Sequence, residues 1–139
     1  MIQNKHLGQW AEWQAESHLR NLGYILIQKN YCSRFGEIDL IMSHHHQLIF
    51  IEVKARSKTA YGCAAEVISV SKRQKIIKTA YIFLMQYPQY ESYYCRFDVI
   101  CYDFMQRVTA KMSADFSQCC YRLNWIENAF TFDPELINL

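Results

Sequence analysis

The sequence of 139 residues is long enough for one globular domain with a hydrophobic core and too short for two, so we take residues 1–139 as a single domain. Hydrophobic residues make up 51% of the chain and charged residues 20%, which excludes a disordered or fibrous protein. The net charge of +2 is too small to indicate nucleic-acid binding, so such a function has to rest on local clusters of basic residues.

Neither the first residues nor the cysteines indicate an exported protein. The sequence opens without the apolar segment of a secretory signal, and apolar runs such as residues 48–51 are far too short to span a membrane. We therefore expect a cytoplasmic protein with no membrane association. The six cysteines include no C-x-x-C pair, so we expect free thiols rather than disulfides or a cysteine metal site.

The first predicted element is a helix over residues 4–22. Apolar residues recur there at the spacing of one helix face, and Gly23 follows as a residue that readily takes the left-handed conformation that ends many helices. The predicted apolar face comprises Leu7, Ala11, Ala15, Leu19 and Leu22.

A second helix is predicted to begin at Ser71 and to end before Pro88. Ser71 and Gln74 have the spacing of a capping box, and Pro88 cannot continue a helix because it lacks a backbone N–H group. The inner face of this helix is predicted to comprise Ile76, Ile77, Ala80, Phe83 and Leu84.

Strands are predicted in the segments that are rich in β-branched and aromatic residues. The order of one helix, three strands, a second helix and further strands favours an α/β domain with a mixed central sheet flanked by helices. The predicted strands lie at residues 24–28, in the two halves of a hairpin at 36–56, and at 95–104, 107–112 and 121–130.

The hairpin at residues 36–56 carries charged residues within apolar strands. If its turn is centred in the run of three histidines, position 39 lies opposite position 52, and position 37 opposite position 54. Successive residues of an extended segment alternate between faces, so the three histidines are expected to form a turn rather than a metal site. Residues two apart share a face, and this places four charged side chains on one side of the sheet: Glu37, Asp39, Glu52 and Lys54.

The other face of the hairpin is predicted to be apolar and to pack on a helix, with Ile38, Leu40 and Met42 facing Ile49, Ile51 and Val53. Two opposed carboxylates on the charged face repel each other unless a cation or a proton neutralises them. Mg²⁺ is the simplest cation, because it takes one or two carboxylates together with water and phosphate oxygens. Asp39, Glu52 and Lys54 therefore supply parts for metal-assisted phosphodiester hydrolysis. The alternative is an exposed ladder of ion pairs that protects an edge hairpin from aggregation.

Several ordered motifs extend this pattern along most of the chain. GEIDLI at 36–41, IEVKAR at 51–56, RFDVI at 96–100 and NAF at 128–130 resemble the YraN-like family of small bacterial proteins. That family belongs to the PD-(D/E)xK nuclease superfamily and is related in fold to archaeal Holliday junction resolvases. Motifs agreeing in order are much more specific than an E-x-K spacing alone. The first helix adds matches at Gly8, Glu12, Ala15, Leu19, Gly23 and Tyr24, although Ala11 stands where the family usually has a second glycine.

The resemblance implies a restriction-endonuclease-like core, with a mixed sheet and helices on both sides. By position, it implies that Asp39 and Glu52 bind Mg²⁺ or Mn²⁺ and that Lys54 is the catalytic lysine. Glu12, from the first helix, would be a further acidic residue directed toward the metal. The role of Glu37 stays open between this site and an ion pair with a neighbouring cation.

A run of basic residues follows the hairpin. The run continues to Lys78, and its leading candidates are Lys72, Arg73 and Lys75 near the start of the second helix, with Arg56 and Lys58 before them. Such a run is usually a solvated helix face, but beside a metal site it fits a surface that contacts DNA phosphates. We therefore expect these five residues to bind nucleic acid.

The sequence thus leads to a Mg²⁺-dependent endodeoxyribonuclease, with branched or otherwise structured DNA as a candidate substrate. The alternative is a module that binds nucleic acid on a nuclease fold without cleaving it. A homodimer would suit paired cuts in a symmetric junction, by analogy. Arg96 and Asp98 are expected to form a structural pair, with metal binding by Asp98 as the lesser alternative.

Overall fold

The computed structural model describes residues 2–56, 68–105 and 120–132, with side chains described from His6 onward. The predicted strand at 107–112 lies outside these residues. No helix in the described part of the chain is long and apolar enough to cross a membrane. The elements are α1 (Ile2–Asn21), β1 (Ile25–Cys32), β2 (Glu37–His44), β3 (Gln47–Arg56), α2 (Val70–Gln86), the 3₁₀ helix η3 (Pro88–Tyr90), β4 (Tyr94–Phe104) and β5 (Tyr121–Phe130).

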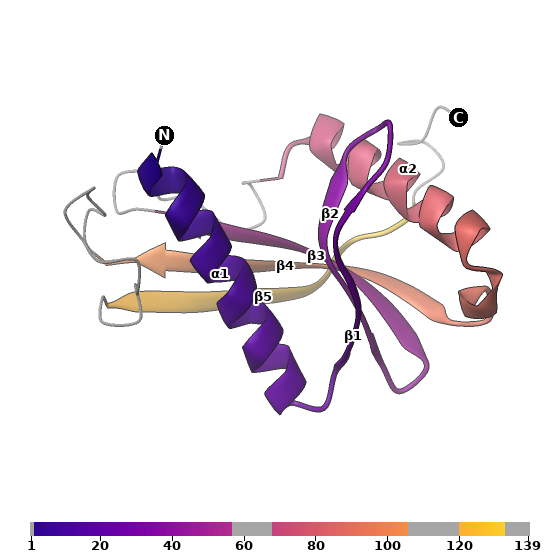
Figure 1. Cartoon of the computed structure of the whole chain (residues 1–139), viewed down its shortest axis with the longest axis horizontal. Coiled ribbons are helices and arrows are strands. Elements are labelled where there is room, and N and C mark those ends of the chain that lie inside the picture. The colour runs from indigo at the N-terminus through magenta and orange to yellow at the C-terminus, as the bar shows by residue number, and fades with distance from the viewer. Residues whose placement is uncertain (1, 57–67, 106–119, 133–139) are drawn as a thin grey trace.

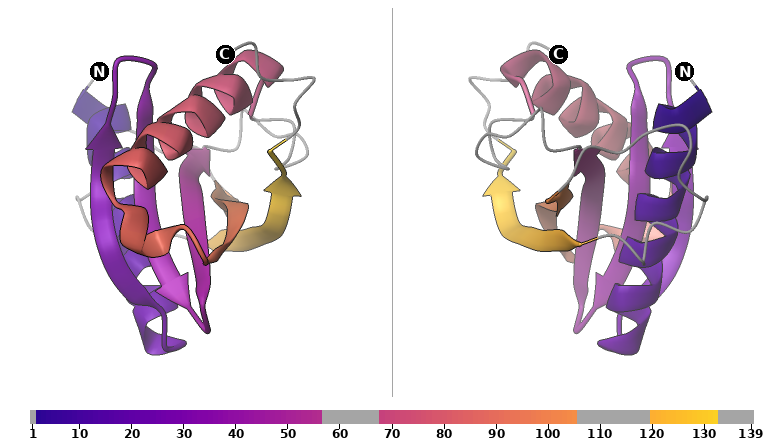
Figure 2. Two further views of the ribbon diagram at one scale, coloured as in Figure 1. Left: turned by 90° about the vertical axis from the view of Figure 1, so that its right-hand side faces the viewer. Right: turned by 90° about the vertical axis from the view of Figure 1, so that its left-hand side faces the viewer.

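The five strands form one mixed sheet in the order β1-β2-β3-β4-β5. Neighbours pair antiparallel except β3 and β4, which are parallel and are connected through α2. The two helices lie on opposite sides of the sheet, as the two side views show (Figures 1 and 2). This arrangement confirms the predicted α/β fold and is compatible with a restriction-endonuclease-like core.

Helix α1 ends as its sequence predicts. Gly23 has a φ of 92°, and two hydrogen bonds close the end of the helix, from Gly23 N to Arg20 O and from Tyr24 N to Leu19 O. The helix faces the sheet through the predicted apolar positions, with one correction: Leu22 is 50% exposed, because it lies beyond the last helical residue. The α1 side of the core comprises Leu7, Trp10, Ala11, Ala15 and Leu19 with Leu40, Met42, Ile49, Ile51, Val53, Ile100, Tyr102 and Phe104.

Helix α2 begins two residues earlier than the capping box predicts. The N-cap is Ser69, whose hydroxyl accepts a hydrogen bond from Lys72 N at 3.1 Å, so Ser71 lies inside the first turn. Both serines have a polar residue three positions later, and the sequence pattern alone favoured the wrong one. The end before Pro88 is confirmed. The α2 side of the core includes Ile76, Ile77, Ala80 and Phe83 with Tyr31, Ile38, Ile41, Leu48, Phe50, Phe97, Val99 and Phe130.

The register of the β2–β3 hairpin follows the prediction. His44 pairs with Gln47, and the two residues between them, His45 and His46, have φ values of 49° and 63°, so they form the tight turn. The pairing continues to Leu40 opposite Ile51. One prediction for the apolar face is wrong: Ile38, which lies beyond the point where backbone pairing with β3 ends, belongs to the core beneath α2, while Leu40 packs on the α1 side.

A buried ionic network joins β4 to its neighbours. Asp98 is fully buried and accepts hydrogen bonds from Arg96 Nε at 2.8 Å and Trp125 Nε1 at 2.9 Å, and from the backbone N of Asn128 at 2.9 Å. Arg96 also donates to the Gln47 side chain on β3. Asp98 is therefore saturated by structural partners, as the prediction of a structural pair requires.

Candidate metal and nucleic-acid site

The candidate site lies where β2 separates from β3. Backbone pairing of the two strands ends at Leu40 and Ile51. The next residue of β2, Asp39, contacts β3 through its side chain rather than its backbone. Its Oδ2 accepts a hydrogen bond from Val53 N at 2.8 Å. The side chain thereby satisfies a buried backbone donor that the diverging strand no longer reaches. The sequence-based register places Asp39 beside Glu52, and the structure brings these two residues together in this way.

The two carboxyl groups share a buried environment. Asp39 is 9% exposed and Glu52 is 6% exposed. Burial raises the pKa of Asp39 well above its usual range, and a hydrogen bond with Glu52 and the charges of Glu52 and Glu12 raise it further. The hydrogen bond from Val53 opposes this shift. Burial beside a second carboxyl group therefore favours the protonated form of Asp39.

One oxygen of the pair lacks a hydrogen bond. Oε2 of Glu52 is buried and makes none with any described residue. Lys72 Nζ lies 3.3 Å from this oxygen, at ion-pair distance but outside hydrogen-bond geometry. Burial alone would lower the pKa of Lys72, but the charge of Glu52, the close approach of the two side chains and the charge of Asp39 outweigh it and raise that pKa. Lys72 therefore provides the positive charge nearest to Glu52 within the described residues.

A pocket of about 230 Å³ opens over this pair. Its walls come from the loop before β2, from β2 and β3, and from the first two turns of α2. A ligand in the pocket would therefore meet both carboxyl groups and the basic start of α2. The lining residues are Phe35, Gly36, Glu37, Asp39, Glu52, Lys72, Lys75 and Ile76.

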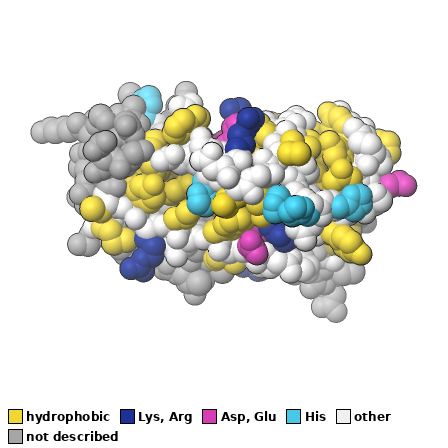
Figure 3. All heavy atoms as spheres, turned by 90° about the horizontal axis from the view of Figure 1, so that it is seen from below, with side chains coloured by type: hydrophobic (Ala, Val, Ile, Leu, Met, Phe, Trp, Pro, Cys, Tyr) yellow, Lys and Arg dark blue, Asp and Glu magenta, His cyan; other side chains and the backbone are white. Residues whose placement is uncertain are grey.

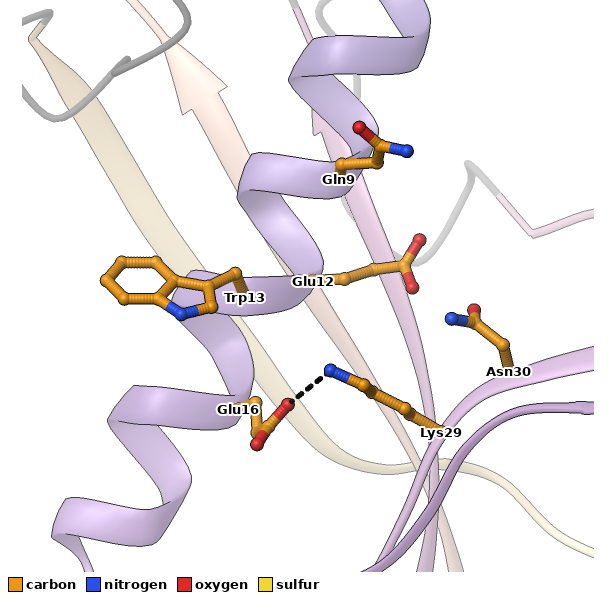
Figure 4. Close-up of a pocket in the computed structure, with 6 residues that line it drawn as sticks. All are labelled: Gln9, Glu12, Trp13, Glu16, Lys29 and Asn30. Atoms are coloured by element: carbon orange, nitrogen blue, oxygen red, sulfur yellow. Dashed lines mark hydrogen bonds and ion pairs between the residues drawn. The ribbon is translucent and has the colours of Figure 1, made fainter.

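Glu12 approaches the pair from α1. Burial raises the pKa of Glu12, and the charges of Glu37 and Glu52 raise it further, while a hydrogen bond with Asn30 lowers it. Figure 4 shows Glu12 and Glu16 projecting on the same side of α1 as Lys29 and Asn30, while Trp13 points the other way. Glu16 differs from Glu12, because Arg20 and Lys29 both pair with it. Glu12 thus adds negative charge to the site, and no lysine or arginine among the described residues forms an ion pair with it.

Lys54 and Glu37 lie at the margins of the site. Lys54 is half-buried and stands two residues after Glu52 on β3, so it shares the face of Glu52. It is also close enough to Lys72 to affect the pKa of that residue. Glu37 is exposed, lines the pocket, and accepts a weak hydrogen bond from the Cys32 thiol. Glu37 therefore adds charge at the entrance rather than inside the pair.

The basic residues expected to bind nucleic acid separate into two groups. Lys72 and Lys75 line the pocket. Arg56 is buried, and its Nε donates to Asp103 at 2.6 Å, while Arg73 donates to Ile68 O and lies over the Phe130 ring. Lys58 lies outside the described residues. We therefore place only Lys72 and Lys75 of the described set at the mouth of the site.

The structure adds Arg34, which sequence analysis missed, and Lys78, a further basic residue of the run on α2. The guanidinium of Arg34 lies 4.9 Å from the centre of the Phe35 ring, and Lys78 Nζ lies 5.3 Å from it. Phe35 is also part of the pocket wall, so these two cations extend the basic surface of Lys75 around its mouth. An Arg-Phe-Gly sequence before a strand was the available signal, but it could not be connected to a helix more than forty residues away.

Another face of the molecule carries no such concentration of charge. Seen from below the view of Figure 1, the surface is mainly hydrophobic, histidine and uncharged polar, with Lys and Arg scattered over it (Figure 3). The basic residues that gather around Phe35 are therefore a local feature and not a property of every face.

The donor set fits Mg²⁺ or Mn²⁺. Asp39 and Glu52 supply carboxylate oxygens, and the buried Oε2 of Glu52 lacks a hydrogen-bond partner. Mg²⁺ characteristically takes one or two carboxylates and completes its shell with water or phosphate oxygens. Within the described ranges, no group of three or more His, Cys, Asp or Glu residues lies close enough together to hold a metal ion. The site therefore suits an ion that is held by Asp39 and Glu52, while Glu12 would attract the ion through its charge from a longer distance.

Known proteins resemble this chain over nearly its whole length. The model of the family described as "Uncharacterised protein family UPF0102" matches residues 11–102. A UPF0102 protein of Acinetobacter baumannii strain SDF is 51% identical over 133 residues, which cover 96% of this chain and 100% of the relative. A UPF0102 protein of Stutzerimonas stutzeri strain A1501 is 38% identical over 130 residues, which cover 94% of this chain and 98% of the relative. The matching family is the YraN family, so the resemblance inferred from the motifs is confirmed.

Proposed function

We propose that this chain, which belongs to the UPF0102 family, is a metal-dependent endonuclease that hydrolyses phosphodiester bonds of DNA. The observation that carries the proposal is the Asp39–Glu52 pair, buried beneath a pocket with basic walls and holding one carboxylate oxygen without a hydrogen bond. Perturbed carboxyl groups in a pocket are typical of catalytic sites. A purely structural pair would not need an opening toward cationic side chains.

Asp39 and Glu52 would hold Mg²⁺ or Mn²⁺. The ion would supply Lewis-acid chemistry, polarising the phosphate and activating water. Lys54, on the same face of β3 as Glu52, is suited to stabilise the negative charge that develops on the phosphate. Glu12 would strengthen the attraction of the site for a cation, because its charge already acts on Asp39.

The basic residues around the pocket suit a DNA backbone. Lys75, Arg34 and Lys78 surround Phe35 at the mouth of the pocket, where phosphates flanking the cleaved bond would lie. Such contacts position a strand without reading its sequence. We keep branched DNA as a candidate substrate and a homodimer as the assembly that would suit it. A DNA substrate also implies a cytoplasmic protein.

The test is cleavage by the purified chain of linear, flapped and four-way DNA with Mg²⁺ or Mn²⁺. Asp39→Asn and Glu52→Gln preserve size and remove charge, so we expect each to abolish cleavage while DNA binding persists. Glu16→Gln is the matched control, because it removes a carboxylate from α1 that already has two cationic partners. The absence of cleavage of every substrate by the wild type would overturn the enzymatic proposal.

A binding module without catalysis is the second candidate. It is favoured by the position of Lys72, whose ammonium group already lies 3.3 Å from Glu52 and neutralises it without a metal ion. In that case the wild type would bind DNA equally well with and without divalent ions. The Asp39→Asn and Glu52→Gln variants would then bind DNA as the wild type does, and none of the three would cleave it.

A further inference from the structure

We propose that Lys72 occupies the cation position of the Asp39–Glu52 pair, so that a divalent ion binds by displacing its ammonium group toward the DNA. This inference rests on the proposed function, because it assumes that the pair takes a metal ion. It assigns Lys72 a positioning role that couples metal binding to DNA binding.

The geometry of Glu52 supports this exchange. Its Oε2 is buried, has no hydrogen bond from the described residues, and faces Lys72 Nζ at 3.3 Å. A buried carboxylate oxygen is costly to leave without a partner, so it needs a positive charge at this point. An ion pair without hydrogen-bond geometry is a weak partner, and a divalent ion with shorter and stronger contacts would replace it.

Lys72 is anchored by its backbone while its side chain can leave. Its backbone N donates to Ser69 Oγ in the N-cap of α2, which fixes the start of the side chain beside the pocket. The side chain itself is 43% exposed, against 6% for Glu52. The ammonium group can therefore exchange Glu52 for solvent without any movement of the helix.

The other cations near the site are not placed to do this. Within the described residues, Lys72 is the only lysine or arginine with an ion pair to Asp39 or Glu52. Arg56 pairs with Asp103, and Arg73 turns toward Ile68 O. Lys75 lines the same pocket one turn of helix onward and is exposed. Lys75 therefore offers a matched control on the same face of α2.

A displaced Lys72 would add a cation to the surface around Phe35, beside Lys75. The site would then hold the metal ion with its carboxylates and the substrate phosphate with the lysine that the metal has released. A bound metal ion would raise the affinity for DNA, and bound DNA would raise the affinity for the metal ion, because both bind better when Lys72 has left Glu52.

The test is titration of the full chain with Mn²⁺ by calorimetry at one pH, without DNA. We compare the wild type with Lys72→Met, Lys75→Met and Glu52→Gln. We expect Lys72→Met to bind Mn²⁺ about fivefold more tightly than the wild type, since the ion no longer has to displace a half-exposed ion pair. Lys75→Met removes a charge from the same pocket but breaks no ion pair with Glu52, so it should tighten Mn²⁺ binding clearly less than Lys72→Met does, and an equal gain in both would overturn the displacement. Glu52→Gln should lose binding at this site.

The outcomes separate this inference from the proposed function. Equal or weaker Mn²⁺ binding by Lys72→Met, with binding still lost in Glu52→Gln, would overturn the displacement while keeping the metal site. Mn²⁺ binding that is unchanged in Glu52→Gln would overturn both.

A second measurement follows the released lysine. DNA affinity is measured by fluorescence anisotropy with Ca²⁺ and with a chelator, because Ca²⁺ can fill a carboxylate site without supporting the reaction of Mg²⁺. We expect Ca²⁺ to tighten DNA binding by the wild type several-fold more than by Lys72→Met. An equal gain in both proteins would contradict a role for Lys72 in the coupling.

Discussion

The carboxylate of Asp39 accepts a hydrogen bond from the backbone N of Val53 at 2.8 Å, at the point where β2 leaves β3. One side chain thus completes the sheet and contributes to the acidic pair with Glu52. Because this carboxyl group is buried beside a second one, the fold bears an electrostatic cost that a bound cation would relieve.

Asp39→Asn should therefore stabilise the metal-free protein. The pKa of Asp39 is raised in the folded state, so its contribution to stability is full below the unfolded pKa and is lost as the pH rises through the folded pKa. An amide keeps an acceptor for Val53 and removes this loss. We expect the gain in the free energy of unfolding to be near zero at about pH 4 and to reach about 1–2 kcal/mol at about pH 8. Melting temperatures of the variant and the wild type over this pH range would show the same trend.

Asp103→Asn provides a control, because its effect on stability should depend on pH in the opposite direction. Burial would raise the pKa of Asp103, but hydrogen bonds, with that of Arg56 the strongest, lower it. Its contribution is present above the unfolded pKa and is lost as the pH falls through the folded pKa. This variant should be less stable than the wild type at pH 7, with the difference shrinking in acid. A gain for Asp39→Asn that did not change with pH would contradict the burial of a charged pair.

Glu12→Gln should reduce cleavage without unfolding the protein. Glu12 acts on Asp39 and Glu52 through its charge, so removing it should weaken Mn²⁺ binding and cleavage by about tenfold, as removal of an outer partner of a metal site typically does. Glu16→Gln, one turn further along α1, should leave both unchanged. The measurements are cleavage rates at several Mn²⁺ concentrations. Equal effects of the two substitutions would show that the position of Glu12 is not special.

Asp98→Ala should destabilise the fold rather than the site. It removes the partner of Arg96, Trp125 and Asn128 and leaves the partly buried guanidinium of Arg96 without its nearest carboxylate. We expect the free energy of unfolding in urea to fall by about 3–5 kcal/mol. Glu127→Gln is the control, because Glu127 is 57% exposed and 4.0 Å from Arg96, and it should cost less than about 0.5 kcal/mol. A small loss for Asp98→Ala would contradict the structural role.

Arg34→Gln and Lys78→Gln should each weaken DNA binding. Both cations lie beside Phe35 at the mouth of the pocket, so each would contact a phosphate. Each substitution should reduce the dependence of log affinity on log salt by about 0.9, the value for one lost phosphate contact on a duplex. Arg20→Gln removes the same charge from the exposed end of α1, where the arginine pairs with Glu16, and should have little effect. Anisotropy titrations at several salt concentrations make the comparison.

The sequence was most informative where local pattern determines structure. The turn at His45 and His46, the end of α1 at Gly23 and the strand at 121–130 were all predicted, because turn chemistry and alternation are local properties. The hairpin register also predicted that Asp39 lies beside Glu52. The family motifs then supported the mixed sheet.

Predictions from the sequence failed where the structure depends on contacts between segments that are far apart in the chain. Ile38 lies in the core beneath α2 rather than beneath α1, and Ser69 rather than Ser71 caps α2. The burial of Arg56 and its ion pair with Asp103 were likewise not evident from the sequence. The placement of Lys72 against Glu52 depends on where α2 packs on the sheet, which no local sequence pattern indicates.

The measurement that tests the central claim most directly is a crystal structure of the protein with Mn²⁺, using the anomalous signal of the ion. We expect a peak between the carboxylates of Asp39 and Glu52, bonded to Glu52 Oε2, with the ammonium group of Lys72 moved away from that oxygen. A structure with Lys72 still against Glu52 and no ion at the pair, at Mn²⁺ concentrations that support DNA cleavage, would contradict the account.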